Sequence, residues 1–140
     1  MMFEPVFKSA VKLAAAAALL LGLTGLGGCV TVEAPEPVVL NGAAGYLERV
    51  ALPQNSAITI AVIDLDTPGV VIAQKSFNVV SAPVPFKFIL PRESIDKKVN
   101  YGVVALIKHN NQVIFQTYDR YPVINNDKFT TEVIMKPVQR

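Results

Sequence analysis

Short apolar runs separated by turn residues dominate the chain from Gly45 onward, and no stretch of a dozen residues has the spacing of an amphipathic helix. Runs of Val, Ile, Phe and Tyr bounded by Gly, Pro, Asn or Asp are typical of β-strands. The pattern predicts strands at residues 45–51, 57–65, 70–79, 84–90, 100–109, 112–119 and 129–138. About seven short strands with turns this frequent predict an all-β domain, a single small β-sandwich.

The breaks between these runs contain residues that favour turns. The segment Asp66–Gly69 has Pro and Gly at positions that suit a type II-like turn, and Asn110–Asn111 can adopt the positive φ of a tight hairpin. Pro83 and Pro85 indicate a loop or an irregular edge between two strands. The one candidate helical turn, at residues 92–97, is very short.

Alternation along the strands predicts which side chains point into the sandwich. Ile58, Ile60 and Val62 are the larger members of their run and are predicted to face the core. Beyond them, Ile63 and Leu65 fall on the other face.

Two predicted strands are apolar on both faces, at residues 101–108 and 113–118. A sandwich strand with one face in water should alternate more cleanly. Loops that cover this face, or ordinary packing in a small domain, would explain the pattern. An exposed apolar surface that receives a partner would explain it equally. The candidate residues for such a partner-binding surface are Val104, Leu106, Ile114 and Tyr118.

The N-terminal segment has the three parts of a secretory signal. Lys8 and Lys12 make its start basic, an uninterrupted apolar run follows at Leu13–Leu23, and small residues come after it. A transmembrane helix needs about 20 apolar residues, so this run is too short to be one.

The segment Leu26-Gly27-Gly28-Cys29 is similar to a bacterial lipobox. In proteins with this motif the Cys sulfur receives a diacylglyceryl group, the chain is cleaved before the Cys, and fatty acids such as palmitate anchor the product. One acyl chain binds a membrane only marginally, whereas two or more hold it stably. The alternatives are an ordinary cleaved signal with a coincidental Cys, or a buried free thiol. Val30, rather than Asp, follows the Cys, which favours the outer membrane.

These features divide the chain into a signal peptide at residues 1–28, a lipidated Cys29 with a flexible tether at residues 29–44, and a β-sandwich at residues 45–140. Pro35 and Pro37 make the tether semi-extended, at about 3.1 Å per residue. A first strand could begin inside it, near Val38.

Charge and cysteine usage exclude several classes of function. The formal charge is +2, and removal of Lys8, Lys12 and Glu4 with the signal leaves +1. That balance gives no electrostatic footprint for nucleic acid. Cys29 is the only cysteine, so no internal disulfide can form.

Reactive residues do not form a cluster in the sequence. His109 is the only histidine and is most simply a solvated turn residue. Asp64 and Asp66 could bind calcium, which needs six or more oxygens, but they are better interpreted as turn-capping residues. No nucleophile-elbow serine or glycine-rich phosphate loop is present. We therefore expect no enzymatic activity, no metal and no cofactor.

Tyr118, Arg120 and Tyr121 could stack a sugar or a base. Aromatic packing at a sheet edge is the simpler interpretation. A small-molecule or glycan-binding envelope module, and a structural envelope protein, stay open as alternative functions.

Six stretches in order carry a family resemblance across Gly45–Val138: Arg49–Pro53, Ile58–Asp64, Ala73–Lys75, Pro85–Pro91, Tyr101–Phe115 and Pro122–Asn125. The domain resembles the YbaY-family lipoproteins, which are related to the YscW-type lipoproteins of type III secretion. The resemblance implies a prealbumin-like (transthyretin-like) or immunoglobulin-like sandwich on an outer-membrane lipoprotein, without catalytic residues. YscW-type members act as pilotins, which bind a secretin subunit and help it reach and assemble in the outer membrane.

Taken together, these observations predict a non-enzymatic lipoprotein that faces the periplasm. A covalent lipid would anchor it to the outer membrane, and its domain would bind a protein partner of the cell envelope, with a secretin as one candidate.

Overall fold

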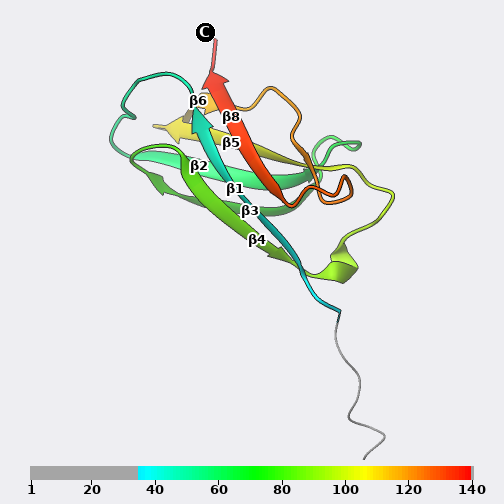
Figure 1. The fold of residues 1–140 in the computed structure, drawn as a ribbon. Coiled ribbons are helices and arrows are strands. Elements are labelled where there is room, and N and C mark those ends of the chain that lie inside the picture. The colour runs from blue at the N-terminus through cyan, green and yellow to red at the C-terminus, as the bar shows by residue number, and fades with distance from the viewer. Residues whose placement is uncertain (1–34, 140) are drawn as a thin grey trace, which may run out of the picture. The chain divides into compact units, whose positions relative to one another are not determined.

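The computed structural model describes residues 35–139, and within them eight strands form one sheet (Figure 1). The strands are β1 (Val38–Tyr46), β2 (Ser56–Asp64), β3 (Val71–Val79), β4 (Val84–Leu90), β5 (Tyr101–His109), β6 (Gln112–Gln116), β7 (Pro122–Val123) and β8 (Thr130–Pro137). A single 3-10 turn, η1 (Arg92–Ser94), precedes β5 and replaces the predicted helical turn at residues 92–97. The all-β class predicted from the sequence is confirmed.

The predicted strands agree with the observed ones except that the short β7 was not predicted, β6 ends three residues earlier than expected, and the first strand begins earlier. Residues 45–51 were predicted as a strand, but β1 ends at Tyr46 and begins at Val38, inside the predicted tether. The compact unit of the chain begins at Glu36, so the boundary between tether and sandwich lies earlier than residue 45. The centre of β1 is Asn41-Gly42-Ala43-Ala44, which has low β-propensity, and neighbouring strands rather than local preference hold it extended.

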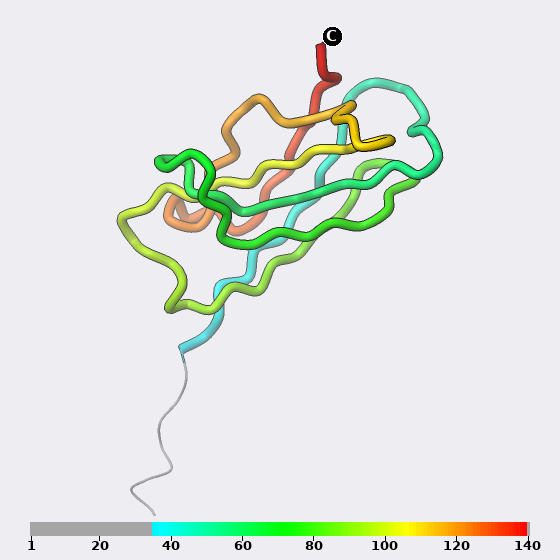
Figure 2. The backbone as a smooth tube through the Cα atoms, turned by 180° about the vertical axis from the view of Figure 1, so that it is seen from behind, coloured from blue at the N-terminus to red at the C-terminus, as the bar shows by residue number. Residues whose placement is uncertain are grey.

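The strand order in the sheet is β3-β2-β5-β6-β8-β1-β4, and β7 pairs with β5 beside this path. Every pairing is antiparallel except that of β1 with β8, which is parallel. The sheet folds over on itself, so that β4, β1 and β8 cross β3, β2 and β5 as a second layer (Figure 1). Figure 2 shows the same arrangement from behind, with β2, β3 and β5 side by side. The result is a sandwich that is close to a closed barrel.

The core fills the space between these two layers. Ile58, Ile60 and Val62 of β2 are fully buried, as their alternation predicted. They meet fully buried residues from other strands, among them Leu40, Val103, Ile107, Val133 and Met135. Replacing such a residue by Ala typically costs 2–5 kcal/mol of stability, so this one core holds the domain together without a disulfide.

The turns use the residues that the sequence pattern indicated. Asn110 and Asn111 have φ of 51° and 64° in the hairpin between β5 and β6. After β2, Asp64 Oδ1 accepts hydrogen bonds from the backbone N–H groups of Asp66 and Thr67, at 2.8 and 3.2 Å. Asp64 is therefore a turn-capping residue, as expected.

Candidate functional site

The outward face of β2 and β5 carries apolar side chains where water should favour polar ones. The register places Ala61 opposite Val104 and Thr59 opposite Leu106. Since Ile60 and Ala105 of the same strands point into the core, these four residues point outward. Ala61 is buried, and Val104 and Leu106 are half-buried, although they point away from the core between the two layers. This face therefore differs from the solvated face of an ordinary antiparallel sheet.

A hollow of about 260 Å³ opens on this face, and we call it the outer-face groove. It is lined by Thr59, Ala61, Ile63, Val71, Gln74, Val104, Ala105, Leu106, Gln116 and Thr117. None of these lining residues is charged. The hydroxyl groups of Thr59 and Ser76 are 2.8 Å apart and hydrogen bond to each other, so the polar groups beside the groove are already partly satisfied. An apolar floor with a neutral polar rim suits an apolar side chain of a partner.

Leu65 closes one end of this face. A Cβ atom on Gly102 would lie 2.8 Å from the Leu65 side chain, so Leu65 packs directly over Gly102 and a larger residue would displace it. The loop after β2, which contains Leu65, thus covers Gly102 but not Val104 and Leu106, which line an open hollow. Of the two explanations for the apolar outer face, coverage by a loop therefore applies to Gly102 only.

The four predicted partner-binding residues do not all meet. Val104 and Leu106 line the outer-face groove. Ile114 is absent from its lining and packs against the core, because the pairing of β5 with β6 shifts register between Ile107 and Lys108 and breaks the alternation there. Tyr118 lies beyond β6, is also absent from the lining, and has 53% of its surface exposed.

The other eight lining residues were not among the sequence candidates, and they include the apolar Ala61, Ile63 and Val71. The sequence placed Ile63 on the outward face correctly. The strand order, which places β2 between β3 and β5, and the register of these strands were needed to join these residues to Val104.

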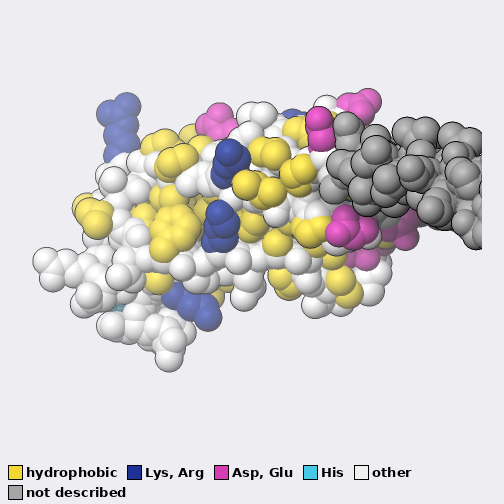
Figure 3. All heavy atoms as spheres, turned by 90° about the horizontal axis from the view of Figure 1, so that it is seen from below, with side chains coloured by type: hydrophobic (Ala, Val, Ile, Leu, Met, Phe, Trp, Pro, Cys, Tyr) yellow, Lys and Arg dark blue, Asp and Glu magenta, His cyan; other side chains and the backbone are white. Residues whose placement is uncertain are grey.

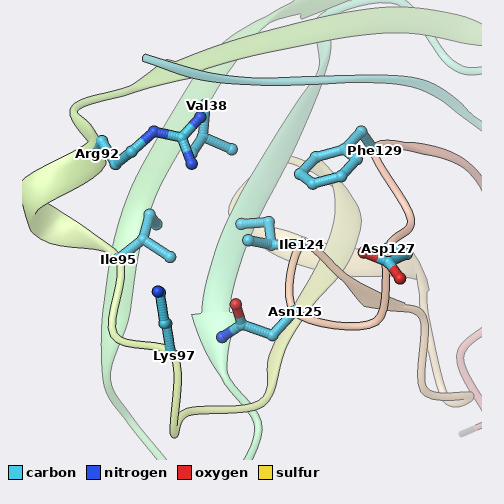
Figure 4. Close-up of a pocket in the computed structure, with 8 residues that line it drawn as sticks. All are labelled: Val38, Arg92, Ile95, Lys97, Ile124, Asn125, Asp127 and Phe129. Atoms are coloured by element: carbon cyan, nitrogen blue, oxygen red, sulfur yellow. The ribbon is translucent and has the colours of Figure 1, made fainter. Parts of the chain in front are cut away.

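A second hollow, of about 380 Å³, lies where the chain enters β1 (Figure 4). Its lining residues are Val38, Arg92, Ile95, Lys97, Ile124, Asn125, Asp127 and Phe129. Ile124 has φ of 69°, which is rare for a β-branched residue, and its N–H donates to Lys128 O at 2.7 Å. The amide of Asn125 donates to the carbonyls of Asp96 and Val99, so it ties two loops together. The polar groups of this second hollow are largely engaged in holding the loops.

The residues considered for sugar binding do not gather in either hollow. The Tyr121 hydroxyl donates to Ile134 O at 3.3 Å and accepts from Ile134 N at 3.1 Å. Arg120 Nη2 donates to Leu65 O at 3.5 Å. Tyr121 and Arg120 thus fasten the segment after β6 to its neighbours.

Asp66 has hydrogen-bond partners, whereas His109 is half-buried and its Nδ1 is buried with no hydrogen-bond partner among the described residues, so His109 is not the solvated turn residue expected. Asp66 accepts hydrogen bonds from the backbone and side chain of Asn100, and His109 Nε2 lies 3.2 Å from Asn110 Nδ2. Across residues 35–139, no three His, Cys, Asp or Glu side chains come together as metal ligands would.

The predicted lipobox, Leu26, Gly27, Gly28 and Cys29, lies outside the described residues. In the part of the chain that is described, no helix is long and apolar enough to cross a membrane.

Comparisons with known proteins give a matching family model, a similar curated protein and a similar solved structure. A family model described as type III secretion system lipoprotein chaperone (YscW) matches residues 35–135. The uncharacterised lipoprotein YbaY of Escherichia coli K12 is 29% identical over 106 residues, which are 72% of this chain and 56% of YbaY. The chain thus spans little more than half the length of that curated relative. The solved structure of an alternative pilotin from the type II secretion system of Vibrio cholerae has a TM-score of 0.68 and 27% identity, covering 75% of this chain and all of that one.

Proposed function

Because this chain belongs to the YscW family of type III secretion system lipoprotein chaperones, we propose that it is a pilotin-like lipoprotein of the bacterial outer membrane. In this proposal a lipid on Cys29 anchors the protein, and the sandwich binds a periplasmic protein client through the outer-face groove. The client is a secretin subunit, by analogy with the YscW-type members. The protein acts by binding and not by catalysis.

The outer-face groove is the observation that supports client binding. Apolar surface in contact with water costs about 25 cal/mol per Å², and a partner that covers it recovers this free energy. Val104 and Leu106 offer such a surface on paired strands, so little order has to be imposed when a client binds.

The anchor and the groove would act together. A lipid on Cys29 would confine the domain to a thin layer at the membrane, within reach of its tether. Confinement raises the effective concentration of the groove toward any client that reaches the same membrane. An amphipathic client segment would be shielded from aggregation while it is held.

Replacement of Cys29 by Ser tests the anchor. We expect the wild-type protein to begin at a lipidated Cys29 and to fractionate with the outer membrane, and the Cys29→Ser variant to be neither lipidated nor in that fraction. Mass spectrometry of the mature N-terminus and membrane fractionation provide the measurement. A soluble, unlipidated wild-type protein would exclude the anchoring part of the proposal.

Replacement of two groove residues by Thr tests client binding. Thr keeps strand propensity and adds a hydroxyl, so the Val104→Thr/Leu106→Thr variant should fold while its groove becomes polar. We expect crosslinking in the envelope to capture the client with the wild-type protein but not with this variant, because the affinity of the variant for the client is at least tenfold weaker.

The matched control is Leu47→Ser/Val50→Ser, which removes two exposed apolar residues from the loop after β1. This variant should keep its client. Thermal unfolding must show that both variants are folded. If the folded groove variant captures the same client as the wild type, the groove is not the binding site.

A further inference from the structure

The sheet has two free edges, and they belong to consecutive strands. β3 and β4 end the strand order at opposite sides, since β3 pairs only with β2 and β4 only with β1 within the described chain. No ladder of backbone hydrogen bonds joins β3 to β4, although residues 80–83 connect them directly. We call the gap between these two edges the seam. Within residues 35–139, the sheet is therefore not closed into a barrel at this place.

The register shows which backbone groups of β4 face the seam. Asn41 N donates to Phe129 O, 2.9 Å away on the β8 side, so Asn41 is turned away from β4. Its partner in the register is Lys87, which therefore directs its own N–H and C=O away from β1. Backbone groups alternate along a strand, so Ile89 faces the same way as Lys87. Pro85 offers only a carbonyl there.

The same reasoning applies to β3. Asp64 N donates to Val70 O, so the even-numbered residues of β2 turn their backbone groups toward β3. Ile60 is therefore bonded to Lys75 across the β2–β3 pair. The residues between, Gln74, Ser76 and Asn78, direct their N–H and C=O groups into the seam. Two rows of strand donors and acceptors thus border the same gap.

A lysine side chain occupies the seam in this structure. Lys75 Nζ donates to Lys87 O at 2.5 Å and lies 5.4 Å from the centre of the Phe88 ring. A single ammonium group thus stands where the N–H groups of a strand would otherwise bond. Lysine on an edge strand is a common device against unwanted strand pairing.

The surroundings of the seam are apolar and cationic. Lys75 and Lys87 are the only charged residues on β3 and β4. Phe77 and Ile89 on the same strands have 40% and 61% of their surfaces exposed. Figure 3, which shows this side from below, displays Lys and Arg side chains among apolar ones. A segment with carboxylates and apolar residues matches this surface in charge and in polarity.

We propose that the seam binds an extended client segment of alternating apolar and acidic residues, which adds as a strand between β3 and β4. The inserted strand replaces Lys75 as the donor to Lys87 O, and the freed ammonium pairs with a carboxylate of the segment. A strand has backbone donors and acceptors on both of its sides, so a segment that lies about 4.8 Å from each edge would bond to both. The inference rests on the proposed function in taking a polypeptide client, but it uses strands other than the outer-face groove.

Binding of a defined peptide tests the proposal. The full-length protein, purified in detergent, is titrated with the labelled peptide Thr-Val-Glu-Val-Thr-Val-Glu-Val-Thr, and fluorescence anisotropy gives the affinity. We expect saturable binding and slower hydrogen exchange at the amides of Gln74, Ser76, Asn78, Lys87 and Ile89. The same peptide with Lys in place of Glu, or with N-methylated alternate residues, should bind at least tenfold more weakly.

A charge-reversed pair of variants locates the site. Lys87→Glu should weaken binding of the acidic peptide at least tenfold. Lys108→Glu, an equal charge change at an exposed residue of β5 away from the seam, should change it less than twofold. Equal effects of the two variants, or binding without protection of the five amides, would overturn the proposal. Protection that appears without peptide and grows with protein concentration would also overturn it, since a second copy would then fill the seam.

The Val104→Thr/Leu106→Thr variant separates this inference from the proposed function. It should bind the peptide as the wild type does, even though it loses its envelope client. Loss of peptide binding in this variant would place the peptide in the outer-face groove and refute the seam.

Discussion

Gly42 is the residue at which the sheet leaves the least room for a side chain. A Cβ atom there would lie 2.1 Å from the Thr131 carbonyl oxygen of β8 and 2.6 Å from Cζ of Phe86. Gly42→Ala must therefore push a backbone strand or a packed ring aside. We expect it to lower the free energy of unfolding by about 3 kcal/mol, measured by chemical denaturation.

Gly45→Ala in the same strand is the control for this prediction. Its added Cβ would lie 3.3 Å from Pro83 Cβ, a contact that a small shift relieves. We expect a loss of less than about 1 kcal/mol. Equal losses for the two variants would mean that the close approach of β1 to β8 and Phe86 does not determine the residue at position 42.

Among the elements, β1 is the strand whose bounds were hardest to predict: residues 45–51 were favoured, and its true start at Val38 was only an alternative. Ile58, Ile60 and Val62 identified β2 because their size and alternation are local signals. The centre of β1 has small residues because Phe86 and Thr131 pack closely against it. Both of these residues are far from β1 in the sequence, so no local pattern shows the constraint. The candidate site behaved similarly. The apolar residues on both faces of the strand pointed to Val104 and Leu106. Ile114 instead packs against the core, because the register between β5 and β6 is irregular, and no local sequence pattern predicts that irregularity.

The edge strand β3 carries the next prediction. Lys75→Thr removes the ammonium group from the seam and leaves Phe77 beside an unprotected strand edge. Because a free, uncharged edge is a template for strand pairing, we expect this variant to self-associate. Sedimentation velocity at low and high protein concentration measures the effect.

Lys108→Thr is the matched control, since it removes an exposed lysine from the paired strand β5. It should stay monomeric wherever the wild type does. If Lys75→Thr is also monomeric at every concentration, Lys75 does not protect the edge.

At the scale of the whole molecule, the sequence predicted the all-β class but not how the sheet folds back so that its first and last strands pair. The strands and turns are local, whereas the parallel pairing of Asn41 with Thr130 joins the two ends of the domain and has no local signature. This pairing leaves β3 and β4 as the free ends of the sheet. β3 then borders both candidate surfaces, with Val71 and Gln74 lining the outer-face groove and Gln74 also facing the seam.

The parallel pairing of β1 and β8 also determines how the domain would respond to mechanical force. β1 begins at one end of the domain and β8 finishes at the other (Figure 1). A pull on the start of β1 against the end of β8 loads their hydrogen bonds in shear, all at the same time, instead of unzipping them singly. β4 on the other flank of β1 shares the load. Under the proposed function, in which a lipid on Cys29 would hold the chain ahead of β1, this geometry would keep the domain folded under tension.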